Sequence, residues 1–271
     1  MELRDLLDRL WTDYVTVNPQ AGIIHELLRA RGEVVDNDHI ALRTFGDPRV
    51  DLEVLARPFL AAGYVDGDDY EFPAKGLRAR HYDPPTPALP RLFVSALRLG
   101  EGSVCSPWAQ ALCRRLVDAI DPALLARPDL CAAGRPWPAI AAADYERLAA
   151  ESEYAAWVAA FGYRANHFTV SVNRLRTIGS IAEINALIEA AGIPLNHAGG
   201  AIKGGPEVLL EQSSTLAAPA LVDLADGART IPGCYYEFAR RYPGPDGRLF
   251  GGFVARSADR IFESTDRRAS T

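Results

Sequence analysis

The chain has 271 residues, of which 48% are hydrophobic and 24% charged, with a formal net charge of −6, which is ordinary globular composition. The lack of long basic runs excludes nucleic acid as the main partner, and no run approaches the ~20 apolar residues of a membrane span. The charged start has no signal-peptide core and the four cysteines show no C-x-x-C spacing, so we expect a cytoplasmic protein with reduced thiols.

Residues 1–37 are predicted to form two N-terminal helices. Apolar residues recur at helical spacing over 2–15, and a second short helix is expected between Pro19 and Gly32. The second helix is predicted to place both Ile23 and Ile24 against the core. Its His25 is interpreted as a surface or packing residue.

Residues 38–45 are predicted to form a β-strand, in which alternate side chains share a face. One face carries His39, Ala41, Arg43 and Phe45. The other face carries apolar Ile40 and Leu42 and suits a hydrophobic core. The first face therefore brings an imidazole and a guanidinium together, a plausible wall for a site that holds a metal and a carboxylate.

The next segments complete a β-α-β-β-β unit over residues 38–100. A helix is predicted over 51–62, followed by β segments near 70–72, 77–82 and 91–99. Residues 101–162 are rich in alanine and interrupted by prolines, which indicates a helical insertion.

A second unit is predicted over residues 163–271. Residues 166–173 alternate between polar and apolar side chains, with His167 on the polar face. A helix follows, with a capping box formed by Ser180 and Glu183. Strands are predicted over 207–213, 234–240 and 250–254, and a last short helix from Ser257. We thus expect one α+β domain spanning residues 1–271.

The two units place a histidine at the start of their first strands, His39 in one and His167 in the other. Paired βαβββ units resemble the vicinal-oxygen-chelate superfamily, whose modules form a cupped mixed sheet around a divalent metal. In that superfamily a histidine on a first strand and a glutamate on a late strand bind the ion. Glu237, in the aromatic-rich segment 234–240, matches the late glutamate.

Two histidines and one carboxylate form the facial triad of non-haem Fe(II) oxygenases, which leaves positions open for substrate and O2. The ligand types do not exclude zinc or manganese. The competing interpretation is a pair of hydrogen-bonded core histidines, which the equivalent positions and Glu237 disfavour. Arg43 is expected to bind a carboxylate near the metal, against the alternative of a surface salt bridge.

Other polar residues are weaker candidates. His81 could replace a ligand or act as an acid or base, but a surface position in an arginine-rich hairpin is favoured. His197 is expected in a loop, where it could touch substrate. Tyr235, Tyr236, Arg240 and Arg241 are expected to be mostly packing or surface residues. The glycine pairs near residues 199–205 are interpreted as loops, because they lack the context of a nucleotide-binding loop.

Four segments together are similar to the 2-oxoadipate dioxygenase/decarboxylase family, also called hydroxyglutarate synthase and formerly a domain of unknown function. These segments are residues 37–45, 166–169, 236–239 and 250–264. The resemblance implies an Fe(II) enzyme that converts 2-oxoadipate and O2 to 2-hydroxyglutarate and CO2 in lysine catabolism. It implies His39, His167 and Glu237 as iron ligands and Arg43 as the substrate-carboxylate residue needed for decarboxylation.

The chain departs from the longer bacterial members, whose extra sequence toward the C-terminus helps to line the substrate pocket. The expected partners are a small 2-oxo acid and O2, and the sequence indicates no oligomeric state. Two other functions stay open. One is another metal-dependent vicinal-oxygen-chelate activity, a lyase or an isomerase, and the other is a catalytically silent protein that binds a metal or small molecule.

Overall fold

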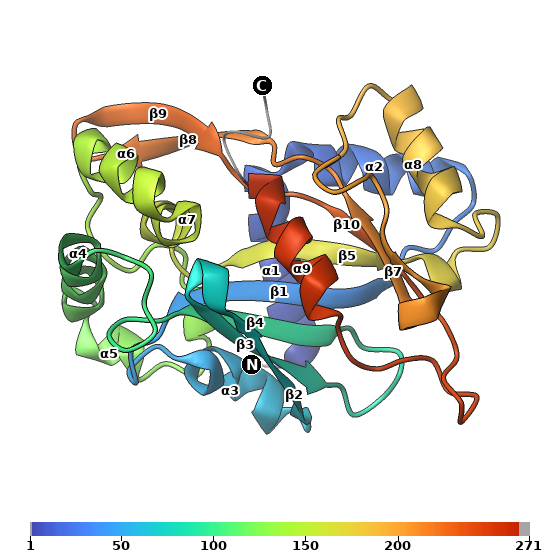
Figure 1. Cartoon of the computed structure of the whole chain (residues 1–271), viewed down its shortest axis with the longest axis horizontal. Helices are drawn as coiled ribbons and strands as arrows, with labels where there is room; N and C mark the ends of the chain where they lie inside the picture. Colours follow the sequence, from blue (N-terminus) through green and yellow to red (C-terminus); the bar gives the residue numbers. More distant parts are fainter. Residues whose placement is uncertain (1, 266–271) are drawn as a thin grey trace.

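The computed structural model describes residues 2–265 and is built around one large mixed β-sheet (Figure 1). Met1 and the last six residues of the predicted second unit lie outside this range. The strands of the large sheet are β1 (Asn37–Phe45), β2 (Val65–Phe72), β3 (Leu77–Asp83), β4 (Arg91–Leu97), β5 (Ala165–Ser171), β6 (Lys203–Gly205), β7 (Leu210–Ser214) and β10 (Glu237–Arg241). A separate hairpin consists of β8 (Pro219–Leu224) and β9 (Gly227–Pro232).

The helices lie before, between and after the strands. They are α1 (Leu3–Val17), α2 (Pro19–Ala30), α3 (Leu52–Ala61), α4 (Pro107–Asp118), α5 (Pro122–Leu125), α6 (Ala142–Glu151), α7 (Glu153–Phe161), α8 (Ile181–Ala190) and α9 (Ala255–Phe262). Short 3-10 turns are η1 (Pro73–Lys75), η2 (Leu130–Ala132), η3 (Val172–Arg174), η4 (Pro206–Val208) and η5 (Glu263–Thr265). The helices expected at the N-terminus, in the insertion and near the C-terminus are therefore present.

The strand order shows two similar halves, β2-β3-β4-β1 and β5-β10-β7-β6, joined by the antiparallel pair β1–β5. In each half the first strand runs parallel to the strand beside it in the same half, β1 to β4 and β5 to β10. The remaining pairs within each half are antiparallel. An approximate two-fold axis therefore passes close to the pair Ile40–Phe168. This repeat agrees with the predicted βαβββ units and with a vicinal-oxygen-chelate-like α+β fold.

The outer face of the sheet, which carries Ile40, Phe168 and Phe238, is buried beneath the N-terminal helices. Tyr14 of α1 packs on Phe168 with ring centroids 5.0 Å apart, and its hydroxyl donates to the carbonyl oxygen of Tyr235. Burial of this apolar face supplies much of the driving force for docking the helices.

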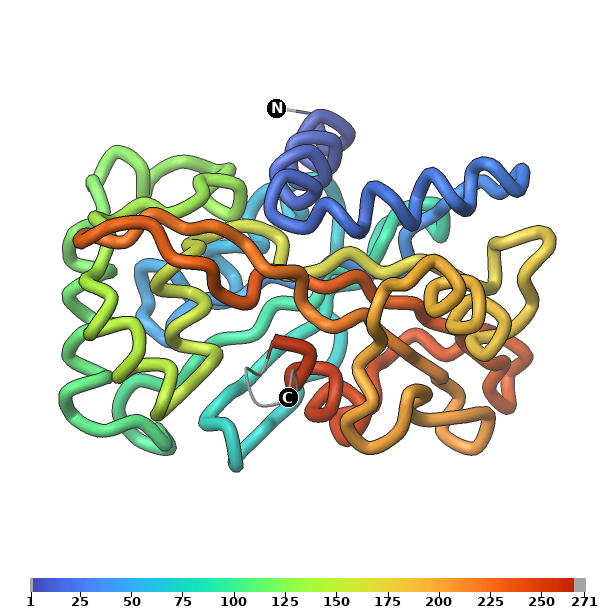
Figure 2. Tube along the Cα trace, turned by 90° about the horizontal axis from the view of Figure 1, so that it is seen from above, coloured from blue at the N-terminus to red at the C-terminus, as the bar shows by residue number. Residues whose placement is uncertain are grey.

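The inner face, which carries His39, Thr169 and Glu237, is covered from the other side by the C-terminal segment, residues 255–265. Figure 2 shows α1 and α2 on one side of the sheet and α9 on the other. Ser264 fixes the segment in place: its hydroxyl contacts Ser214 Oγ at 2.9 Å and accepts from Asn196 Nδ2 at 2.8 Å. The inner face is therefore enclosed.

Some predicted elements differ from the structure. Residues 250–254 form no strand, because the Arg241 guanidinium donates to the carbonyl oxygens of Phe250 and Gly252, groups that a strand would pair with a neighbour. The hairpin β8–β9 was not predicted. Ile23, expected in the core, is 56% exposed. Within residues 2–265, no helix is both long enough and apolar enough to cross a membrane.

Candidate metal and substrate site

Three side chains from the two halves of the sheet meet on the inner face. His39 Nε2 lies 3.4 Å from His167 Nε2 and 3.5 Å from Glu237 Oε1, and His167 Nε2 lies 3.3 Å from Glu237 Oε2. All three residues are buried, with exposed fractions of 2%, 5% and 1%. Their ligand atoms lie within 4.8 Å of one another, close enough for one metal ion to contact all three.

The residue before each histidine fixes the orientation of its ring. Asp38 Oδ1 accepts from His39 Nδ1 at 2.8 Å, and Asn166 Oδ1 accepts from His167 Nδ1 at 3.1 Å. Both Nδ1 atoms therefore carry the proton, and both Nε2 atoms present a lone pair to the centre of the site. A hydrogen bond of this kind on the far nitrogen is typical of metal-binding histidines.

Asp38 is in turn held by Arg241, whose Nε and Nη2 donate to the two carboxylate oxygens at 2.7 and 2.8 Å. Burial alone would raise the pKa of Asp38, but Arg241 and the hydrogen bond from His39 hold it well below its usual range. The carboxylate therefore stays ionised and fixes the His39 tautomer.

The three ligand atoms are electron-rich and would repel one another without a cation. Burial lowers the pKa of His167 well below its ordinary value, since a charged imidazolium would be desolvated and would face His39 and Arg43. Burial also raises the pKa of Glu237, although His39 and a hydrogen bond from Gln212 oppose this. Two imidazoles that present their Nε2 atoms and one buried carboxylate form a donor set that fits a divalent metal ion.

The two-fold repeat explains why three side chains, and not four, converge as candidate ligands among residues 2–265. His39 and His167 occupy equivalent positions, because the axis near Ile40 and Phe168 relates them. Glu237 lies beside Thr169, so its equivalent lies beside Ala41, and that residue is Phe93. An apolar ring thus lies where the repeat would place a fourth ligand, so a metal ion held here would keep positions open for other molecules.

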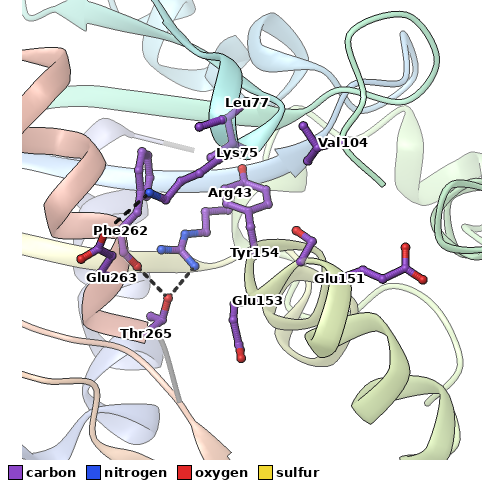
Figure 3. Close-up of a pocket in the computed structure, with 12 residues that line it drawn as sticks. Arg43, Lys75, Leu77, Val104, Glu151, Glu153, Tyr154, Phe262, Glu263 and Thr265 are labelled. Carbon is purple, nitrogen blue, oxygen red and sulfur yellow. Dashed lines mark hydrogen bonds and ion pairs between the residues drawn. The ribbon is translucent and has the colours of Figure 1, made fainter. Parts of the chain in front are cut away.

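Arg43, from the same face of β1 as His39, reaches a separate cavity beneath the C-terminal segment. Arg43 is only 2% exposed. Its guanidinium carbon lies 5.1 Å from the ring centroid of Tyr154, 5.2 Å from that of Trp157 and 5.6 Å from that of Phe262. Figure 3 shows the guanidinium pointing toward Thr265, to whose hydroxyl it donates at 3.3 Å. Its Nε has no partner among the described residues.

The cavity at Arg43 neighbours the three-residue cluster and is lined by other residues. Of the residues described, the cavity is lined by Arg43 together with residues of η1, β3, the loop before α4, the ends of α6 and α7 and the C-terminal segment, and not by His39, His167 or Glu237. Tyr235 contacts both regions. Its ring stacks on His167 with centroids 4.6 Å apart. Burial raises the pKa of the Tyr235 hydroxyl, and the nearby charge of Arg43 opposes this. The two parts are neighbours on one face.

The other sequence candidates are placed as follows. His81, expected at the surface, is buried, because it lies on the inner face and accepts from the Asp68 backbone N–H at 3.1 Å. A Cβ atom at position 67 would clash with the His81 ring, so Gly67 of β2 leaves room for this imidazole. The side chain of His197 is 64% exposed. His25 is a packing residue, whose ring lies on Trp11 with centroids 5.4 Å apart.

Sequence reasoning missed two residues of the inner face, Gln212 and Lys203. Gln212 donates to Glu237 Oε1 from the neighbouring strand β7. Lys203 lies opposite Gln212 on β6, in a glycine-rich stretch that was interpreted as a loop. The signal that could have found Lys203 is its position directly before the glycine pair Gly204-Gly205, with which it forms a short strand.

The fold and the cluster define the class: a two-module vicinal-oxygen-chelate-like protein with a buried His-His-Glu site. The profile of the 2-oxoadipate dioxygenase/decarboxylase family matches residues 3–118 and 130–250. A rice protein named 2-oxoadipate dioxygenase/decarboxylase is 36% identical over 97% of this chain and 78% of its own length. The chain therefore belongs to the 2-oxoadipate dioxygenase/decarboxylase family.

Solved structures support this assignment. Rice hydroxyglutarate synthase in complex with 2-oxoadipate superposes with a TM-score of 0.90, at 35% identity, over 98% of this chain and 93% of that one. A Shewanella frigidimarina protein described as a candidate hydrolase has a TM-score of 0.88 and 48% identity, covering 94% and 98%. A Ralstonia eutropha protein assigned to the glyoxalase superfamily shares the fold, with a TM-score of 0.70, 22% identity and coverage of 92% and 85%.

Proposed function

We propose that this chain is an Fe(II)-dependent dioxygenase/decarboxylase that converts a 2-oxo acid and O2 to a 2-hydroxy acid and CO2. With 2-oxoadipate as substrate, the products are 2-hydroxyglutarate and CO2, and all atoms of both reactants are accounted for. The relatives named as 2-oxoadipate dioxygenase/decarboxylases and the rice complex with 2-oxoadipate support this choice of substrate.

The observation that carries the proposal is the convergence of His39, His167 and Glu237, with both Nδ1 atoms already engaged by side-chain oxygens. This donor set suits Fe(II), and zinc or manganese would be held by the same atoms. When bound, the metal would polarise the 2-oxo group and bring O2 next to it.

The protein's own groups have three tasks in this proposal. Arg43, a buried guanidinium that has no carboxylate partner among residues 2–265, orients the substrate carboxylate near the metal and offsets its charge. Asp38 and Asn166 accept from the two Nδ1–H groups and so keep both Nε2 atoms aimed at the centre of the site. The C-terminal segment excludes water, which strengthens each electrostatic contact in the site.

We also treat residues 1–271 as one metalloenzyme domain, since the proposed ligands come from both βαβββ units. Residues 1–37 would supply the N-terminal helices, 38–100 and 163–271 the two modules, and 101–162 the helical insertion. The cytoplasmic location and the role in lysine catabolism stay predictions.

The test is anaerobic loading with Fe(II), followed by O2 and a panel of 2-oxo acids, with measurement of O2 uptake, CO2 and hydroxy-acid products. We expect one CO2 and one hydroxy acid for each O2 consumed. His167→Ala should bind Fe(II) at least ~100-fold more weakly, because one of three ligands is lost.

Two outcomes would contradict the proposal. Metal binding by His167→Ala as tight as that of the parent would contradict the assignment of His167 as a metal ligand. Metal binding by the parent protein with no O2 uptake on any 2-oxo acid would leave the fold intact and favour a lyase, an isomerase or a silent binding protein.

A further inference from the structure

Tyr235 is a fully buried tyrosine whose hydroxyl has no hydrogen-bond partner. Its side chain is 0% exposed, and Oη forms no hydrogen bond with any of residues 2–265. A buried hydroxyl without a partner costs free energy in the folded chain. A ligand group that accepts from this hydroxyl would remove that cost.

The strand register places the Tyr235 ring beside the candidate metal ligands. Glu237 pairs with Thr169 in the parallel ladder of β10 and β5, so Tyr235, two residues earlier, comes beside His167 on the inner face. The ring stacks on the His167 imidazole with centroids 4.6 Å apart and an interplanar angle of 28°. Tyr235 therefore forms part of the wall of the candidate metal site.

Arg43 lies on another side of the same tyrosine. Ala41 pairs with His167, and Arg43 is two residues further along β1 on the same face. Burial raises the pKa of Tyr235, and Arg43 opposes this rise, because its positive charge is close to the hydroxyl. A guanidinium carries donors only, so the hydroxyl proton of Tyr235 finds no acceptor there.

Two buried donors thus lack an acceptor next to the His-His-Glu cluster: the Tyr235 hydroxyl and Nε of Arg43. Along β1, only the methyl group of Ala41 separates His39 from Arg43 on this face. One carboxylate has two oxygens and about four lone pairs, so it can accept from both donors at once. The pair therefore suits a carboxylate that lies between the metal ligands and the guanidinium.

Position, and not burial alone, distinguishes Tyr235. Three other buried tyrosines also have hydroxyls without a partner among the described residues: Tyr82, Tyr163 and Tyr236. Tyr163 packs on Trp137 and Tyr236 on Trp11, both of which are packing residues of the fold. Of these tyrosines, Tyr235 has its ring on a candidate metal ligand.

We propose that the Tyr235 hydroxyl donates a hydrogen bond to the substrate carboxylate that Arg43 orients, which makes Tyr235 a further substrate-binding residue. This inference rests on the proposed function, which places the 2-oxo acid at the metal and its carboxylate at Arg43. Tyr235 keeps its proton throughout and takes no part in the bond changes. The contact is to a group that all 2-oxo acids share.

A packing role is the competing explanation, in which the ring only holds His167 in place. Tyr235→Phe separates the two, because it keeps the ring and removes Oη. Under a packing role, this variant binds both the metal and the 2-oxo acid as the parent does. Under the proposed role, it binds the metal normally and the 2-oxo acid weakly.

The experiment is anaerobic calorimetric titration of the Fe(II)-loaded full chain with 2-oxoadipate. The Kd of Tyr235→Phe should be roughly 10- to 100-fold higher than that of the parent, since one hydrogen bond to a charged group is lost. The affinity for Fe(II), measured by competition with a chelator, should change less than about 3-fold. The same titration with 2-oxobutanoate should show a similar loss, because this acid has the same 2-oxo acid group.

Tyr236→Phe is the matched control. It removes the same atom from the next residue, which is equally buried and packs on the opposite side of the sheet. It should leave the Kd of both acids within about 3-fold of the parent. Neither variant should have a lower urea midpoint than the parent, because each loses a buried hydroxyl that has no partner.

Four outcomes would overturn the proposal. The first is an unchanged Kd in Tyr235→Phe, and the second is an equal loss in Tyr236→Phe. The third is a lower urea midpoint in Tyr235→Phe alone, which would show that the hydroxyl already has a partner in the free protein. The fourth is a loss confined to 2-oxoadipate, which would place the hydroxyl at the other end of the substrate.

These measurements also separate the proposal from the proposed function, because none of them requires turnover. Weaker binding in Tyr235→Phe by a protein that consumes no O2 would leave the contact standing and remove the dioxygenase reaction. O2 uptake by a parent protein whose Tyr235→Phe variant binds both acids equally well would do the reverse. A parent protein that binds neither acid would overturn both.

Discussion

Arg43 combines full burial with an absence of carboxylate partners among the described residues, and aromatic rings surround its guanidinium. Such a group is retained at a cost in stability, which is reasonable only where it meets an anion during function. The rings hold the guanidinium plane, so that its two-pronged geometry is set before a carboxylate arrives.

Arg43→Ala should therefore keep metal binding and lose turnover. We expect kcat/KM for 2-oxoadipate to fall at least ~100-fold, the size of a lost bidentate contact to a charged group, and Arg43→Lys to restore little of it. Metal titration and steady-state kinetics measure the two effects. The control is Arg248→Ala, which removes an exposed arginine. Activity near that of the parent in Arg43→Ala would contradict this role.

Asn166 is expected to act through His167. Asn166→Ala removes the oxygen that accepts from Nδ1, so the ring is free to rotate and to exchange tautomers. Metal affinity should fall roughly 10- to 100-fold, as for other residues that orient metal ligands. Competition with a chelator of known affinity measures this. Asn166→Asp should retain tight binding, and equal affinity in Asn166→Ala and the parent would show that the contact is dispensable.

For single residues, the sequence was informative where side chains alternate along a strand and where the βαβββ unit is repeated. His39, His167, Glu237 and Arg43 all lie on the inner face, as their spacing predicted. Gln212 and Lys203 could not be found in this way, because their roles depend on which strands become neighbours. The Asp38–Arg241 pair joins residues that no local pattern connects.

At the level of elements, the C-terminal segment is the cover of the inner face, and polar side chains help to attach it. Ser264 contacts Ser214 and Asn196, and Lys75 of η1 binds Asp259 at 2.7 Å. Terminal segments open at a smaller free energy than the strands of a central sheet, and we expect the same of this one.

Ser264→Ala should loosen this cover. The change leaves the buried Asn196 amide and Ser214 hydroxyl short of a partner, which costs about 1–3 kcal/mol. We expect faster amide hydrogen exchange over residues 255–265 and little change in β1 and β5. Arg256→Ala, an exposed change on the same helix, is the control. Uniform acceleration over the whole sheet would show that the segment does not open on its own.

The elements that sequence reasoning missed have physical reasons. The hairpin β8–β9 pairs only with itself, and its short strands begin or end at proline, which resembles a loop. Residues 250–254 alternate in a strand-like way, but their carbonyls are bound by the Arg241 side chain instead of a neighbouring strand. The local sequence pattern shows which backbone conformations a segment can adopt. Whether the segment becomes a strand depends on which other strand lies beside it.

For the whole molecule, buried His81 makes stability depend on pH. Burial lowers its pKa, although Asp83 and Asp68 oppose the effect. The unfolded chain takes up this proton near pH 6.5, whereas the folded chain does so only at lower pH. The free energy of unfolding should therefore decrease as pH falls below about 6.5, by up to ~1.4 kcal/mol per pH unit for this residue.

Urea unfolding at several pH values between 8 and 5, with a metal chelator present, measures this in the parent, His81→Gln and His197→Gln. The glutamine at position 81 should make the pH dependence shallower. His197→Gln should not, because that ring is exposed in the folded chain. Identical pH dependence in all three proteins would remove His81 as the cause.

The seam between β1 and β5 has a consequence for the order of events during synthesis. His39 belongs to one half of the sheet, and His167 and Glu237 belong to the other. At roughly 5–20 residues per second, His39 is made some tens of seconds before Glu237. A nascent chain that has not reached residue 237 offers two imidazoles at most, so a metal ion held by all three residues would be a sign that both halves have been translated and joined.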